Sequence, residues 1–164
     1  MNAAAIVKVG ESSKEYENIR KGLEHSLCGY ISENFQEILE ADKRDVQYST
    51  SIFLRGELEK LCKQEHAGRS VNLTSYMVVA ADKDMNQFVS VQWGRGMIVA
   101  EGDEKKYIIS CPAYREKLKE TYSRINGNDL TKICIKKGEL CGIKKFRLVE
   151  NRKLPDDREE VIEC

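Results

Sequence analysis

The sequence predicts an α+β fold, a single domain in which one antiparallel β-sheet (a meander plus a C-terminal hairpin) packs against two to three helices. Two observations lead to this class. Up to about Glu65 the apolar residues recur every three or four positions, which is typical of amphipathic helices. After Val71 they form short runs separated by turn residues, which is typical of antiparallel strands. Because tight turns rather than crossover helices join these runs, we expect the order α-α-β-β-β-β-α-β-β.

The first helix is expected to begin at Ser12, which forms a capping box with Glu15, and to end at about Leu39 or Glu40. Its apolar residues share one face. They are Ile19, Leu23, Leu27, Tyr30, Ile31, Phe35 and Ile38. This spacing predicts a long helix with one side buried against the sheet.

A second helix is expected from Ser51 to about Glu65, after a polar connection over residues 42–45. Its inward residues are Leu54, Leu58, Leu61 and Cys62. Gly68 supplies a stop signal. The alternative for part of this region is a strand over residues 48–54.

Four strands are then predicted, over residues 73–81, 87–93, 97–101 and 106–111. The segments between them carry turn residues, including Gly94-Arg95-Gly96, which we interpret as a hairpin turn. In the second of these strands alternate residues share a face, so that Val89, Val91 and Trp93 point to one side.

The C-terminal third is expected to add a helix, a hairpin and a tail. Pro112 suits the first turn of a helix over residues 113–125. Two strands, 130–137 and 139–150, would pair around Lys137-Gly138, and this register places Cys134 opposite Cys141. If Gly138-Glu139 is the loop instead, the register shifts and these two cysteines no longer pair. The domain would span residues 1–153, and the charged tail over 154–164 would fray.

Composition excludes several classes of protein. The chain has 164 residues, 41% of them hydrophobic and 33% charged, which suits one soluble domain with a core. Lys+Arg and Asp+Glu are 27 each, so neither a polybasic nor an acidic disordered protein is indicated. No apolar run is long enough to span a membrane, and the first residues do not resemble a secretory signal. We therefore expect a cytoplasmic protein without membrane contact.

The cysteines and histidines do not predict a metal or cofactor site. The six cysteines are dispersed, as expected of reduced thiols: Cys28, Cys62, Cys111, Cys134, Cys141 and Cys164. His25 and Cys28 with Cys62 and His66 have the spacing of a zinc site. Helical phase argues against it, because Leu23 and Leu27 point inward and His25 lies about 200° from Leu23 at 100° per residue. No metal and no cofactor is expected.

No catalytic motif is recognisable, and the chain is expected not to be an enzyme. Only the two histidines are unperturbed bases near neutral pH, and neither a nucleophile elbow nor a phosphate-binding loop is present. Enzymatic activity without a recognisable motif stays open as an alternative.

Charge segregation is the clearest indication of a partner. Residues 130–153 contain eight basic and two acidic residues, whereas residues 154–164 contain five acidic and one basic. The predicted binding residues combine the basic hairpin with an aromatic–arginine loop. They are Trp93, Arg95, Lys136, Lys137, Lys144, Lys145 and Arg147.

These observations favour a small, non-enzymatic protein-binding module, such as an inhibitor, an immunity protein or a chaperone-like adaptor. It would occlude the surface of a protein partner with acidic residues, steered by the basic hairpin and anchored by Trp93. The alternative is a nucleic-acid-binding domain that uses the same hairpin. Against that alternative, Phe146 is the hairpin's only aromatic residue for stacking on bases.

Overall fold

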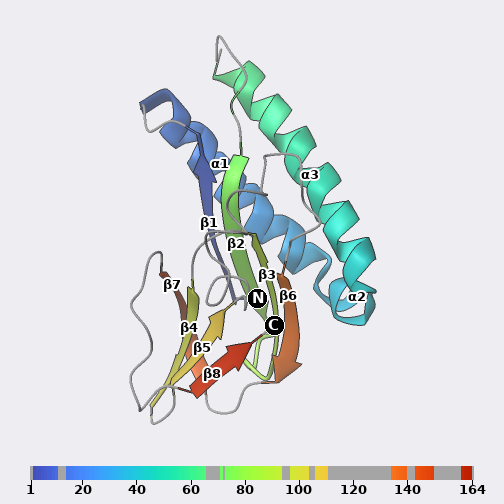
Figure 1. Ribbon diagram of the computed structural model, residues 1–164, viewed down its shortest axis with the longest axis vertical. Coiled ribbons are helices and arrows are strands. Elements are labelled where there is room, and N and C mark those ends of the chain that lie inside the picture. Colours follow the sequence, from blue (N-terminus) through green and yellow to red (C-terminus); the bar gives the residue numbers. More distant parts are fainter. Residues whose placement is uncertain are drawn as a thin grey trace, which may run out of the picture.

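Three layers, one of helices and two of β-sheet, make up the structure, a computed structural model (Figure 1). The structure describes residues 2–10, 14–65, 71, 73–93, 97–103, 106–110, 134–139, 143–149 and 160–163. The first sheet has the order β1-β2-β3-β6 and the second the order β7-β4-β5-β8. The predicted α+β class is confirmed, but the expected single sheet is two. Within the described residues, no helix has the length and apolar character that crossing a bilayer requires.

The helical layer consists of α1 (Lys14–Glu33), α2 (Phe35–Glu40) and α3 (Lys43–Gln64). The first predicted helix is therefore interrupted at Asn34, whose side-chain amide donates to the Tyr30 carbonyl. The second begins eight residues earlier than predicted, because the Asp42 side chain accepts the Arg44 N–H and caps it. The strand alternative over 48–54 is wrong.

The other regular elements of the described chain are strands. Their bounds are β1 Asn2–Val9, β2 Leu73–Ala81, β3 Gln87–Trp93, β4 Met97–Gly102, β5 Lys106–Ser110, β6 Cys134–Glu139, β7 Ile143–Val149 and β8 Glu160–Glu163. The strands predicted between residues 73 and 111 are present within a residue of their expected bounds. The helix predicted over 113–125 lies outside the described residues.

Two strands were not predicted. β1 contains three successive alanines after Asn2, and alanine is depleted in strands, yet β1 forms an antiparallel ladder with β2 from Asn2↔Ala81 to Val9↔Leu73. β8 lies in the tail that was expected to fray, and it pairs in parallel with β5. The tail prediction is therefore wrong over 160–163.

The predicted pairing of strands is also corrected. β2 pairs with β3 and β4 with β5, but β3 and β4 belong to different sheets, so the meander is divided and these two strands do not form the predicted hairpin. The residues expected to form its turn, 94–96, lie outside the described residues. β6 pairs with β3 and β7 with β4, so the predicted C-terminal hairpin does not form. Cys134 lies opposite Gln92, and Cys141 lies outside the described residues.

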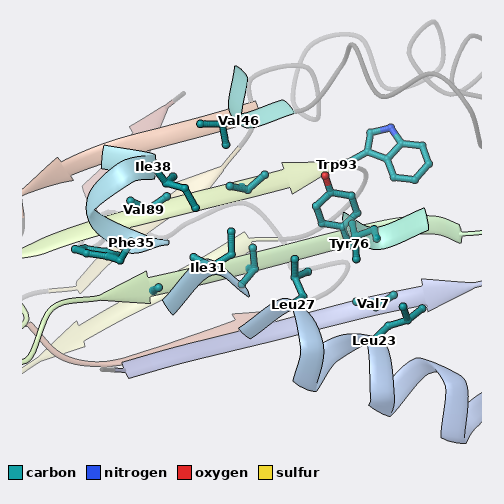
Figure 2. Packing of buried hydrophobic residues seen from close by; sticks show 14 of the residues in the cluster. Val7, Leu23, Leu27, Ile31, Phe35, Ile38, Val46, Tyr76, Val89 and Trp93 are labelled. Carbon is teal, nitrogen blue, oxygen red and sulfur yellow. The ribbon is translucent and has the colours of Figure 1, made fainter. Parts of the chain in front are cut away.

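A first core fills the space between the helices and the first sheet. Four residues of the predicted stripe on α1 are completely buried: Ile19, Leu23, Leu27 and Ile31. They pack with alternate residues of the sheet, including Val78, Val91 and Trp93. Figure 2 shows Leu23, Leu27 and Ile31 of this core together with Trp93. The stripe therefore packs against the sheet as predicted, and each fully buried Leu or Ile contributes roughly 1.5–3 kcal/mol of transfer free energy.

A second core lies between the two sheets. The opposite face of β2 and β3 supplies Met77, Val79 and Phe88, and Ile143, Phe146 and Leu148 of β7 pack against this cluster. β2 and β3 are thus buried on both faces, which explains their nearly continuous apolar sequences.

Candidate interaction surface

Strand β7 carries three of the predicted binding residues at the edge of the second sheet. Phe146 and Leu148 alternate with Lys145 and Arg147, and the former pack into the second core while the latter are exposed. The period-2 pattern of this segment therefore places cations on the outer face of the sheet. Lys144 is exposed as well, because the register between β4 and β7 shifts between Glu101 and Gly102 and leaves Lys144 outside the regular alternation.

Each of these cations has an acidic neighbour from β4 or the residue that follows it. Glu101 accepts from Arg147 Nη2 at 3.2 Å and lies 3.4 Å from Lys145 Nζ. Lys144 Nζ bonds the Asp103 carboxylate. The side chains of Lys144, Lys145 and Arg147 are nevertheless 68%, 71% and 52% exposed. Three cations thus face two carboxylates, and the described strand keeps an excess of one positive charge.

Glu101 is the most enclosed member of this group, with 20% of its side chain exposed. Burial alone would raise its pKa. The hydrogen bonds and charges of Arg147 and Lys145 outweigh that effect, so the pKa of Glu101 lies below its ordinary value. The Glu101 carboxylate is therefore ionised at neutral pH.

The structure separates the remaining predicted residues from β7. Lys136 and Lys137 belong to β6, where they lie opposite Ser90 and Val89 of β3. β6 forms one edge of the first sheet and β1 the other, and β7 contacts β1 (Figure 1). The two basic strands consequently lie at opposite edges of the sandwich, and they do not adjoin as the predicted hairpin required.

Trp93 does not provide an anchor for a partner. Its side chain is 1% exposed and lies in the first core, with its ring centroid 6.0 Å from that of Tyr76 (Figure 2). A partner would have no access to it, so Trp93 is removed from the predicted surface. Arg95 lies outside the described residues.

The zinc arrangement considered from the sequence finds no support in the described residues. His25 is exposed, and Cys28 and Cys62 are free, half-buried thiols. No three His, Cys, Asp or Glu side chains in the described part of the chain are grouped as metal ligands. Burial, followed by the charge of Glu24, raises the pKa of the Cys28 thiol, which disfavours the reactive thiolate.

Sequence reasoning missed the acidic neighbours of β7. Glu101 and Asp103 lie more than 40 positions before the cations they contact. Only the pairing of β4 with β7 brings them together, and the local sequence does not specify this pairing. The chain matches no model of a known protein family, and a search of curated proteins finds no relative.

Proposed function

We propose that this chain is a non-enzymatic cytoplasmic protein-binding module that covers an acidic surface of a protein partner, in the manner of an inhibitor, an immunity protein or a chaperone-like adaptor. The observation that carries the proposal is the row of exposed cations on β7: Lys144, Lys145 and Arg147. They lie on a strand whose other face packs in the second core. A fixed group of cations steers an acidic partner and orients it before contact.

The acidic neighbours of the strand fit this role. Glu101 and Asp103 hold the three cations in place while leaving most of each cation's surface open to solvent. An incoming carboxylate can share these cations without displacing a buried group. Because Trp93 is buried, the proposed steering and occlusion depend on β7.

The test compares two variants of the tagged full-length chain that lose the same charge. One replaces Lys144, Lys145 and Arg147 by Gln. The matched control replaces Lys21, Arg55 and Lys60, exposed cations of the helical layer, by Gln. Each form is used to capture partners from a lysate of the protein's native host, with and without nuclease. The association rate of the purified partner with each form is then measured at several salt concentrations.

We expect one protein partner that survives nuclease. Its association with the β7 variant should slow by about tenfold or more at low salt, and its association with the helical control should change little. Equal association rates for the two variants would contradict the role of β7. Partners that disappear with nuclease would instead indicate nucleic-acid binding.

A further inference from the structure

β1 forms one edge of the first sheet and pairs only with β2 among the described strands. An edge strand presents every second residue's N–H and C=O away from its neighbour. Two hydrogen bonds identify the residues of β1 whose N–H and C=O point away from β2.

The first is the bond from Val7 N–H to Glu24 Oε1 of α1, at 3.1 Å. Val7 lies opposite Tyr76, and its N–H points out of the sheet toward the helix rather than toward β2. Because the direction alternates along an antiparallel ladder, the outward groups of β1 belong to Val7, Ala5 and Ala3.

The second bond gives the same alternation from the other side of β2. Asp82 N–H donates to the Gln87 carbonyl at 3.1 Å, which makes these two residues a hydrogen-bonded pair of the β2–β3 ladder. Two residues earlier, Ala80 bonds Val89 in the same way and therefore turns its backbone groups away from Ala3. Ala3 and Ala5 thus leave their own groups unused by β2.

Only at the C-terminal part of this edge does an outward backbone group of β1 have a hydrogen-bond partner among the described residues. Glu24, held by Arg20 at 2.8 Å, satisfies the Val7 N–H. α1 crosses the sheet obliquely: Leu23 lies over Val7, whereas Phe35, which follows the helix, lies near Val89 of β3 (Figure 2). Within the described part of the chain, the outward groups of Ala3 and Ala5 have no hydrogen bond.

We propose that β1 pairs with β1 of a second copy of this chain, antiparallel, about a two-fold axis at Ala4. This register brings Ala3 opposite Ala5 of the second copy, so the two residues with unused groups meet and form four backbone hydrogen bonds. The two first sheets become one continuous sheet of eight strands. The dimer is independent of the function proposed for β7.

A second copy fits this edge for two reasons. A two-fold contact must be self-complementary, and Ala3 and Ala5 are symmetric about Ala4. The Glu24 carboxylate ends the pairing, because a longer ladder would need the Val7 N–H that it already occupies. The contact therefore covers Asn2 to Ile6, and its short length predicts a dimer that depends on protein concentration.

Cysteine cross-linking tests the register. In the proposed dimer the two Ala4 residues form a non-hydrogen-bonded pair, with Cα atoms about 4.5 Å apart, which suits a disulfide. With oxidised glutathione as the oxidant, Ala4→Cys should form disulfide-linked dimers at least about tenfold more than Asn2→Cys or the unaltered chain. Asn2 is more exposed, but its two copies would be about 13 Å apart. Equal cross-linking of the two variants would overturn the proposal.

Amide exchange tests the hydrogen bonds without any substitution. At high protein concentration the amides of Ala3 and Ala5 should be protected, and dilution should release them, whereas those of Ala4 and Ile6 stay protected by β2. Ala5→Pro removes an N–H that β2 does not use, so it should abolish the dimer and keep the fold by circular dichroism. A monomeric mass at all concentrations with unprotected Ala3 and Ala5 amides would overturn the proposal.

Discussion

The hydroxyl of Tyr76 is buried in the first core and has no hydrogen-bond partner within the described part of the chain. Burial, and to a lesser extent the nearby Tyr30, raises the pKa of this hydroxyl far above its ordinary value. An uncompensated buried hydroxyl costs stability, and removing it while keeping the ring removes that cost. The packing of the ring against Trp93 would be unchanged.

Tyr76→Phe should therefore raise the free energy of unfolding at pH 7 by about 1 kcal/mol. It should also weaken the loss of stability in alkali. Above pH ~10 the unfolded chain releases the Tyr76 proton while the folded chain retains it, so stability falls with pH in the unaltered protein. Urea unfolding at pH 7 and pH 10.5 measures both effects. Lower stability of the variant at pH 7 would mean that the hydroxyl has a hydrogen-bond partner.

Two glycines of α1 allow two contributions to stability to be compared. One is the backbone entropy that any glycine loses in a helix, and the other is the close approach of α1 and α3. A Cβ at Gly22 would lie 3.0 Å from Leu61 Cδ2 and 3.1 Å from Leu61 Cδ1, both on α3. A Cβ at Gly29 would meet no atom within 4 Å. The two positions belong to the same helix and differ in this one contact.

Gly29→Ala should stabilise the protein by roughly 0.5–1 kcal/mol, because alanine loses less backbone entropy than glycine in a helix. Gly22→Ala should gain less or lose stability, because the Leu61 side chain must move by a few tenths of an ångström. Thermal unfolding of both variants gives the comparison. Equal gains would show that α1 and α3 are not in close contact at Leu61.

The same elements show where local sequence is sufficient. The stripe from Ile19 to Ile38 and the alternation of Val89, Val91 and Trp93 are local periodicities, and each correctly predicts which face is buried, although the stripe spans two helices, α1 and α2, rather than one. β1 was missed because its alanines have a weak strand preference and its ladder with β2 forms across more than 60 residues of intervening chain.

At the scale of the whole molecule, strand pairing decides what local sequence cannot. The segments containing Lys137 and Lys144 are strands as predicted, but one joins β3 and the other joins β4 in a different sheet. A hairpin and a switch between sheets have the same short connection and the same alternation. For this reason the two basic segments were predicted as strands, while the hairpin that was expected to join them into one surface does not form. Trp93 failed as an anchor for a related reason, since helices cover the face of the sheet to which it points.

The ion pairs of Glu101 make the stability of the second sheet depend on pH in the acidic range. Arg147 and Lys145 lower the pKa of Glu101 in the folded protein despite its partial burial. A lowered pKa stabilises the folded state above the unfolded value of about 4.5, and this stabilisation is lost as the pH falls through the folded pKa. Glu101→Gln removes the titrating group and leaves the shape of the side chain nearly unchanged.

The free energy of unfolding of Glu101→Gln should therefore fall less between pH 5 and pH 2.5 than that of the unaltered protein, and the variant should be slightly less stable at pH 7. Asp84→Asn, in the exposed turn between β2 and β3, is the matched control and should keep the acid sensitivity of the unaltered chain. Urea unfolding across this pH range gives the comparison. If the free energy of unfolding fell equally with pH in all three proteins, the ion pairs of Arg147 and Lys145 with Glu101 would contribute nothing to the stability of the second sheet. The cations of β7 would then lack the fixed positions on which their proposed role in partner binding depends.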